Sequence, residues 1–458
     1  MTIYRTLQRK LRSQTNPVRN IVLFLLGVTS LLANPSWGIG DNSTISTGQI
    51  LFGLAVILGI LRLSRACPRI WMIIALPIVV CGAFHASSSA GNVDLNIIVS
   101  WVVYSSVMMI GVEAARDDES CAWLIKGVMV GIAVNCVVSA VQYVTMPKAF
   151  PLWPLYQFSR DQERVAGVAQ AFWTPTQIFP FRVFGLFDEP SDMTASICPW
   201  LAFILALRVF PFQKGALRGV GTSSLALLVL LLGTAMIVVG RSGELMFFAP
   251  AMLLMVMWKP PKVRGPQLRR TGRRLLLVVL VAACVAGGVA AVRDRASTEI
   301  NDAATSKGSW NERSSSIQQA VDTWLNPPDF GVVIGRGAAG VAMLLSDTGL
   351  SISSIIVKSL LMYGLVMAVG WVAIAVIVVN SIRSSRFRLG GLVTLTVLVF
   401  GLTVITSNQK LMGPWIIMGL LTRWKFVFHE EEALPALSPV QYMAAPELGF
   451  RPLAKGRN

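Results

Sequence analysis

Four arginines in the sequence have neighbours suited to binding an anion, namely Arg182, Arg241, Arg313 and Arg336. A guanidinium group is planar and permanently charged, and it can bind phosphate oxygens through two parallel hydrogen bonds. Each of the four lies next to a glycine, an expected helix start or the end of an apolar segment. A single surface arginine is more often a solvated charge. Four at such positions predict a site for a polyanion held at the boundary between lipid and water.

Arg241 interrupts a long apolar run that extends from Gly221 to Trp258, and Glu244 follows it closely. The run is long enough for about two membrane crossings of ~20 residues each. A charged side chain at the centre of a bilayer costs several kcal/mol, so such residues usually face a polar cavity. The sequence therefore predicts a hairpin of two transmembrane helices with Arg241 at its tip.

The segment around Arg182 reads FRVFGLFDEP, from Phe181 to Pro190, and it carries the carboxylates Asp188 and Glu189. Several aromatic residues precede it. Aromatic side chains near a membrane commonly anchor at the level of the lipid headgroups. Stacking on sugar rings is the functional alternative for these aromatics, and the sequence leaves both open.

Two further patterns surround Arg313 and Arg336. Apolar residues recur at helical spacing after Trp310 and Arg313, which predicts a short amphipathic helix that Asn326-Pro327-Pro328 ends. The stretch 331–340 reads GVVIGRGAAG, and glycine on both sides of Arg336 would allow a ligand to approach the backbone closely. No Lys-Ser/Thr pair follows, so a P-loop is not predicted. A flexible loop without a ligand is the alternative.

The elements that must position these residues are membrane helices. Of the 458 residues, 54% are hydrophobic and 14% are charged, a composition outside the range of soluble globular domains. Helices satisfy their own backbone hydrogen bonds in lipid, so an all-α, polytopic transmembrane bundle is expected, with about twelve spans. The expected spans are about 20–37, 47–61, 70–87, 94–112, 122–144, 191–207, 222–239, 243–258, 275–292, 352–380, 389–407 and 411–422. The residues 389–422 could instead form one broken helix.

Lysine and arginine collect in alternate loops, which places both termini in the cytoplasm by the positive-inside rule. The acidic loop Glu113–Glu119 departs from that pattern. Most of the net charge of +17 follows from topology, so no nucleic-acid partner is expected. The predicted organisation is a cytoplasmic segment 1–19, membrane helices 20–144, a first outer loop 145–190, central helices 191–292, a large and partly helical outer loop 293–349, C-terminal helices 350–422 and a cytoplasmic tail 423–458.

A metal centre is not expected, because the chain has two histidines and six cysteines without a CxxC pair. The cysteines lie in or beside apolar segments, where buried small residues are the better interpretation.

Four of these patterns occur in an order that resembles the O-antigen polymerase/ligase superfamily. They are RVFGLFDEPS before a span, VVGRSGELMFF, WNERSSSIQQAVDTW with FGVVIGRGAAG, and SLLMYGLVMAVGW, and together they extend over about 181–371. The resemblance implies a metal-independent glycosyltransferase without cofactors, in the inner membrane of a bacterium. Its donor and acceptor would be glycans linked to undecaprenyl diphosphate, with a chain-length regulator and a flippase as further partners.

The resemblance also implies roles for individual residues. Arg241 would act in catalysis by stabilising the diphosphate that departs. Arg182, Arg313 and Arg336 would bind substrate, together with Trp310, Asp188 and Glu189. Ligases of the family have a histidine near the start of the span after the large loop, and this chain has none there. That departure favours a polymerase over a ligase.

Asp347 is then the nearest candidate for the base that takes the proton of the acceptor hydroxyl. It could equally be the N-terminal cap of the helix that follows. A lipid-linked oligosaccharide flippase or another transporter is the alternative of a different class. Transporters usually have corresponding features in two halves near the middle of the membrane, and the sequence has no such repeat.

Overall fold

The protein is predominantly helical. The computed structural model describes residues 17–32, 36–39, 43–88, 92–145, 185–187, 190–209, 216–240, 309–326, 330–348, 352, 354–385, 387–405 and 410–427. Within those residues the sheet structure consists of one antiparallel pair, β1 (Ser36–Ile39) and β2 (Ser43–Ser46), in which Ser36 pairs with Ser46.

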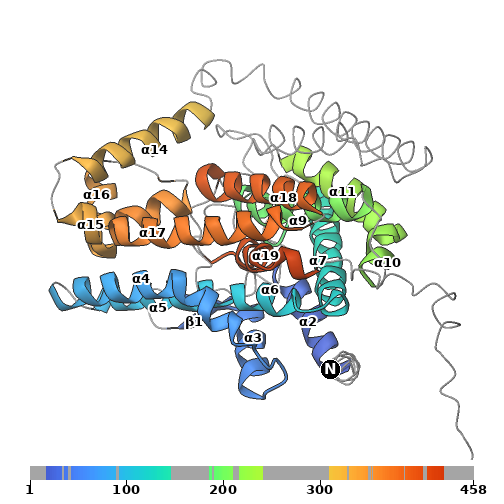
Figure 1. The fold of residues 1–458 in the computed structure, drawn as a ribbon. Coiled ribbons are helices and arrows are strands. Elements are labelled where there is room, and N and C mark those ends of the chain that lie inside the picture. Colours follow the sequence, from blue (N-terminus) through green and yellow to red (C-terminus); the bar gives the residue numbers. More distant parts are fainter. Residues whose placement is uncertain are drawn as a thin grey trace, which may run out of the picture.

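The helices of the N-terminal part are α2 (Pro17–Thr29), α3 (Thr47–Ile57), α4 (Ala66–Ser88), α5 (Asn92–Ser106), α6 (Met108–Ala114) and α7 (Asp118–Thr145). The central helices are α9 (Pro190–Val209), α10 (Ala216–Thr222) and α11 (Ser224–Gly240). The C-terminal part contains α14 (Ser309–Leu325), α15 (Gly331–Ile334), α16 (Gly337–Thr348), α17 (Ile355–Arg383), α18 (Arg388–Phe400), the π-helix η2 (Gly401–Ile405), α19 (Met412–Thr422) and α20 (Trp424–Val427). In Figure 1, α4 and α5 run side by side below α17, and α14 lies above α15, α16 and α17.

Glycines let two helix pairs approach until their backbones touch. A Cβ atom on Gly27 of α2 would collide with the Leu124 carbonyl oxygen of α7, and one on Gly127 of α7 would collide with the Phe24 carbonyl oxygen of α2. Gly111 and Gly419 form an equivalent contact between α6 and α19. Small residues at crossings are the usual packing device between membrane helices, because lipid provides no hydrophobic force to bring helices together.

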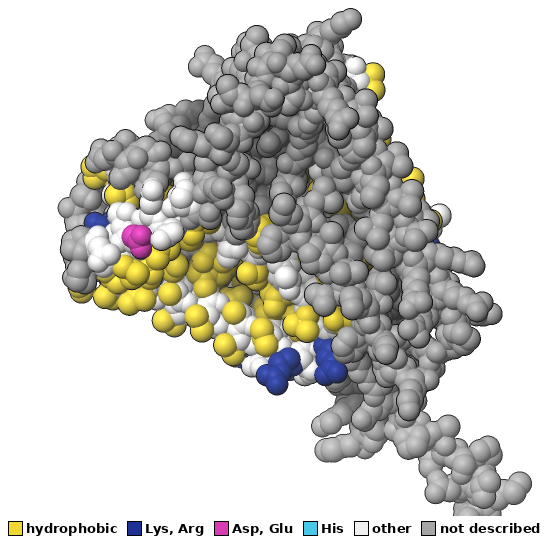
Figure 2. Space-filling view, turned by 90° about the horizontal axis from the view of Figure 1, so that it is seen from above, with side chains coloured by type: hydrophobic (Ala, Val, Ile, Leu, Met, Phe, Trp, Pro, Cys, Tyr) yellow, Lys and Arg dark blue, Asp and Glu magenta, His cyan; other side chains and the backbone are white. Residues whose placement is uncertain are grey.

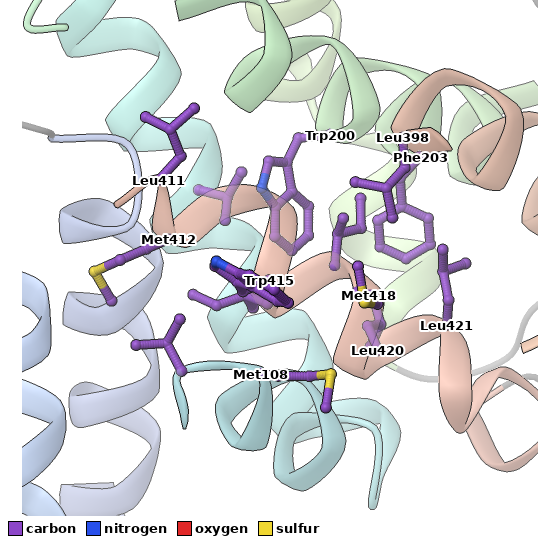
Figure 3. Close-up of a cluster of buried hydrophobic side chains, with 14 of the residues drawn as sticks. Met108, Trp200, Phe203, Leu398, Leu411, Met412, Trp415, Met418, Leu420 and Leu421 are labelled. Carbon is purple, nitrogen blue, oxygen red and sulfur yellow. The ribbon is translucent and has the colours of Figure 1, made fainter. Parts of the chain in front are cut away.

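The core surrounds α19, whose residues are all buried. Figure 3 shows Trp415 and Met418 of α19 beside Trp200 and Phe203 of α9 and Met108 of α6. Trp415 also stacks on Trp371 of α17, with ring centroids 6.0 Å apart. This central helix therefore connects the N-terminal, central and C-terminal groups of helices.

Four described helical segments are long and apolar enough to cross a membrane, and a fifth is included if the bent pair α10 and α11 is one span. The four are Ala66–Ser87, Ile97–Ala114, Asp118–Gln142 and Ile355–Arg383. Large apolar side chains such as Val80, Val369 and Val372 face outward, and Figure 2 shows a hydrophobic surface with few charges over the described part of one face. These properties indicate a membrane protein.

The structure corrects two of the predicted spans. The helix expected over 20–37 ends at Thr29, and residues 36–39 form β1 instead. Pro35 disfavours a helix that continues to residue 37, as the expected span required. The span expected over 352–380 is one element, α17, but its backbone leaves the helical conformation at Gly364, where φ is 63°. At the C-terminal end, α18 with η2 and α19 are separate helices.

The acidic loop that departed from the charge pattern is neutralised by arginines. The buried Glu113 carboxylate accepts hydrogen bonds from Arg19 at 3.2 Å and from Arg116 at 3.1 Å, and from the Ser64 backbone N–H at 3.1 Å. Asp117 also pairs with Arg19, at 3.5 Å. A buried charge is tolerated only when paired and hydrogen-bonded, so this network ties the start of α2 to the loops before α4 and α7.

Candidate functional site

A break in α17 is the centre of the candidate site. At Gly364 the ψ angle is −157°, so the helical ladder is interrupted in the middle of an apolar segment. Groups freed by such a break must find new partners, because lipid offers none. The Leu361 carbonyl oxygen, which would otherwise accept from within the helix, accepts from the Arg336 backbone N–H at 2.8 Å.

A hydrogen bond across the break fixes the angle between the two parts of α17. Trp371 donates from its indole nitrogen to the Ser359 hydroxyl at 2.8 Å. In a straight helix these residues would be separated by about 18 Å along the axis, beyond the reach of any side chain. The bend is therefore a fixed feature of the fold. Tyr363, directly before the break, packs edge-on against the buried Trp101 at 6.0 Å.

The segment that carries Arg336 fits into this break. Gly335 and Gly337 on either side of Arg336 have φ angles of 81° and 67°, which side chains other than glycine rarely adopt. A Cβ atom on Gly335 would collide with the backbone of Met362, and one on Gly364 would collide with the carbonyl of Val333. The glycines thus permit close contact between two segments of the protein itself, α15 and α17.

The side chain of Arg336 is half-buried, and its guanidinium donates to the Thr323 carbonyl oxygen of α14 at 3.5 Å. α14 ends at Leu325, which confirms the stop predicted at 326–328. The alternative interpretation of 331–340 as a flexible loop is wrong, because α15 and α16 occupy most of that stretch. One arginine is therefore held by backbone contacts from α17 and α14.

A second anchored segment contains the middle of the FRVFGLFDEP motif. The side chain of Gln142 on α7 accepts from the Gly185 N–H at 3.0 Å and donates to the Gly185 carbonyl oxygen at 2.9 Å. Asn135, two turns earlier on α7, accepts from the Leu186 N–H at 2.9 Å. Leu186 and Phe187 are buried. This clamp fixes the chain between the positions of Arg182 and of Asp188 and Glu189.

Arg336 is the one predicted site residue whose side chain lies within the described part of the chain. Trp310 and Arg313 lie within α14, and Asp347 lies in the last turn of α16. The side chains of these three are outside the description, as are Arg182, Asp188, Glu189 and Arg241 entirely. That all four arginines form one site for a polyanion stays a prediction.

The alternative role of Asp347 as a helix cap is wrong. Asp347 lies inside α16, and the N-cap of the next helix is Ser354. The Ser354 hydroxyl accepts from the Val357 N–H at 3.1 Å, and it donates to the Leu402 carbonyl oxygen at 3.4 Å. Asp347 is therefore not the N-cap of α17, and its proposed role as a base stays a prediction.

Sequence reasoning missed the residues that hold the two segments. Asn135, Ser139 and Gln142 lie on one face of α7, and all three are buried. Polar residues at helical spacing in an apolar span are expensive in lipid and often functional, so their spacing was a usable signal. No comparable signal pointed to Gly364 or to His85, which contacts the segment of Arg336 from the end of α4.

Among the residues that the structure describes, no three His, Cys, Asp or Glu side chains are grouped so that they could hold a metal ion. Cys67, Cys81, Cys121, Cys136 and Cys198 are free and buried. Comparison of the chain with family models, with curated proteins and with solved structures gives no match. The resemblance to the O-antigen polymerase/ligase superfamily therefore rests on the sequence motifs.

Proposed function

We propose that this protein is a membrane glycosyltransferase that polymerises glycan repeat units carried on undecaprenyl diphosphate, for an exopolysaccharide or O-antigen. It would act at the periplasmic face of a bacterial inner membrane, with about twelve spans and both termini in the cytoplasm. The observation that supports this most is the environment of Arg336. The membrane helix α17 is interrupted at Gly364, and the Leu361 carbonyl oxygen before the break accepts from the Arg336 N–H.

The chemistry requires such a cation and no metal. The anomeric carbon of the donor glycan breaks its bond to a diphosphate oxygen and forms a glycosidic bond to an acceptor hydroxyl oxygen. Undecaprenyl diphosphate departs with the bonding electrons, and the hydroxyl proton passes to a carboxylate, for which Asp347 is the first candidate. Preorganised guanidinium groups stabilise the charge that develops on the leaving group. Arg241 keeps this role, and we add Arg336, which the resemblance assigned to substrate binding, because its backbone is anchored at the break of α17. Arg182 and Arg313 remain assigned to binding.

Two structural features support the topology in this proposal. The Glu113 network brings together Arg19, Ser64 and Arg116, which were all predicted to lie on the cytoplasmic side. The clamp on Gly185 involves the ends of α2 and α7 that were predicted to face the periplasm, since Asn135 also donates to the Leu31 carbonyl oxygen at 2.8 Å. Residues predicted on the cytoplasmic side thus contact one another, as do residues predicted toward the periplasmic side.

Transport is a second candidate, because discontinuous helices are common at the binding sites of transporters. The helix pair α10 and α11 is bent by 51°, and α17 is broken at Gly364. Both breaks, however, are occupied by the protein itself. Arg208 donates to the carbonyl oxygens of Gly221 and Ser223 at 3.1 and 2.9 Å, and Arg336 occupies the break of α17. We therefore favour an enzyme over a transporter. The preference for a polymerase over a ligase rests on the sequence, which has no histidine near the start of the span after the large loop.

Replacement of Arg336 in cells tests the proposal. Arg336→Ala should reduce polymer by about 100-fold, because one preorganised donor to the leaving group is lost. Lipid-linked single repeats should accumulate in extracts analysed by mass spectrometry, and Arg241→Ala should behave in the same way. Arg383→Ala, at the exposed end of α17, is the matched control and should leave the polymer unchanged. Normal polymer in Arg336→Ala at equal protein level would contradict the assignment.

A further inference from the structure

His85 lies in the last turn of α4 and contacts the segment that carries Arg336. Its Nε2 atom is 3.2 Å from the Ile334 carbonyl oxygen. A carbonyl oxygen can only accept, so the imidazole nitrogen carries the hydrogen in this contact. Ile334 is the last residue of α15, where helix carbonyls lack partners within the helix. The imidazole therefore supplies a donor that the end of α15 requires.

The same imidazole ring contacts the segment on the other side of Arg336. A Cβ atom on Gly337 would come within 2.9 Å of the His85 Cγ atom, so the ring packs directly against the Gly337 backbone. Phe84 extends this contact, since its ring lies 6.2 Å from that of Phe330 and 5.8 Å from that of His85. The end of α4 thus contacts the chain at residues before and after Arg336.

α17 also holds the segment, through the hydrogen bond from the Arg336 N–H to the Leu361 carbonyl oxygen. The backbone of Arg336 is consequently fixed between two helices, α4 and α17. With the backbone fixed, the position of the guanidinium group depends only on the side-chain torsions of Arg336. The hydrogen bond to the Thr323 carbonyl oxygen restricts some of these torsions.

We propose that His85 is a positioning residue for Arg336. It fixes the backbone on both sides of the arginine and thereby directs the guanidinium group toward the diphosphate of the lipid-linked glycan. This inference rests on the proposed function for the identity of the ligand. The role of His85 is that of a hydrogen-bond donor, and it requires no proton transfer by the imidazole.

Two substitutions separate the donor role from acid–base chemistry. His85→Gln retains an N–H donor at nearly the position of Nε2 but cannot act as a base at neutral pH, whereas His85→Ala removes the donor. In lipid nanodiscs, hydrogen exchange at the Arg336 amide should be roughly 5- to 100-fold faster in His85→Ala, since the part-buried Ile334 carbonyl loses its partner. In His85→Gln the glutamine amide should replace that hydrogen bond, so the exchange rate at the Arg336 amide should stay within about twofold of wild type.

The affinity of the same preparations for undecaprenyl diphosphate tests whether His85 acts on the ligand through Arg336. His85→Ala should weaken binding in the wild-type background and have no effect in the Arg336→Ala background, because the two changes remove one interaction. Equal effects of His85→Ala in both backgrounds, equal damage by the glutamine and alanine variants, or unchanged exchange in His85→Ala would each overturn the inference. Unchanged affinity in Arg336→Ala, with faster exchange in His85→Ala, would instead overturn the proposed function.

Discussion

Gln142 binds Gly185 as a neighbouring β-strand would, with one hydrogen bond to its N–H and one to its carbonyl oxygen. Such pairing satisfies a short irregular segment that has no strand beside it. Gly185 itself has a φ angle of 59°, and a Cβ atom there would come within 2.5 Å of the Asn135 Oδ1 atom. Glycine is therefore required at 185 both by its conformation and by the approach of Asn135.

At the scale of single residues, Gln142→Ala should loosen the motif around Arg182. The change leaves two buried backbone groups of Gly185 without partners, which costs about 1–3 kcal/mol for each. We expect activity to fall at least tenfold and exchange at the Gly185 amide to rise, measured with purified protein in nanodiscs. Gln318→Ala, on an exposed position of α14, is the control. Unchanged exchange at Gly185 would show that the clamp does not hold this segment.

Arg336 could be selected from the sequence, whereas its surroundings could not. Glycine on both sides of an arginine is visible in one sequence, and it predicts close backbone approach. In the structure, the group that approaches Gly335 is the backbone of α17. Contacts from Thr323 and His85 depend on how distant helices pack, and a single sequence contains no information on that packing.

Among the elements, α17 determines the site, because its break creates the acceptor for Arg336. The break is stabilised from two directions. Trp371 bonds to Ser359 across it, and the backbone of α15 packs into it at Gly364. Short irregular backbone inside membrane proteins is tolerated where it is buried in protein, and Gly364 is buried.

Gly364→Ala should displace the segment of Arg336 without removing the arginine. The added methyl group would collide with the Val333 carbonyl, and the backbone conformation of Gly364, with φ 63° and ψ −157°, costs about 1–3 kcal/mol for a residue with a Cβ atom. Activity should fall at least tenfold, with faster exchange at the Arg336 amide. Gly53→Ala has open space around its Cβ position and is the control. A fully active Gly364→Ala protein would mean that the break is not needed to hold Arg336.

The sequence predicted the existence of most described helices better than their irregularities. Continuous apolar segments predicted α4, α7 and α9 closely, since the length of a membrane span is set by the bilayer. The break in α17 was missed because glycine is common in membrane helices, and hydrophobicity alone does not show which glycine changes the backbone. The bound expected at residue 37 followed the apolar character of the segment and gave no weight to Pro35, which disfavours a helix that continues that far.

For the whole molecule, glycine contacts and a buried carboxylate hold the helices together. Gly27 and Gly127 bring α2 against α7, and Glu113 joins Arg19 and Arg116 near the cytoplasmic end of the proposed topology. These contacts determine where α7 lies, and α7 in turn carries Asn135 and Gln142. The stability of the bundle and the geometry of the candidate site therefore depend on the same helix.

Gly127→Ala should consequently destabilise the whole bundle. Its methyl group would overlap the Phe24 carbonyl oxygen, so α2 and α7 would have to separate, at a cost of about 1–3 kcal/mol. The thermal unfolding temperature in detergent should fall by several degrees, and Gly53→Ala should leave it nearly unchanged. Equal unfolding temperatures for the two variants would indicate that the contact between α2 and α7 is looser than in the structure.

Polymerisation of lipid-linked repeats can be measured with purified protein in lipid vesicles. The only added substrate is the undecaprenyl diphosphate-linked repeat unit of the native polymer. We predict longer lipid-linked glycans with one undecaprenyl diphosphate released per bond formed, in the presence of a metal chelator, and a rate lower by about 100-fold in Arg336→Ala. Movement of intact repeats across the membrane without chain growth would contradict the proposed polymerisation. Chain growth at the same rate in Arg336→Ala would contradict the proposed role of Arg336.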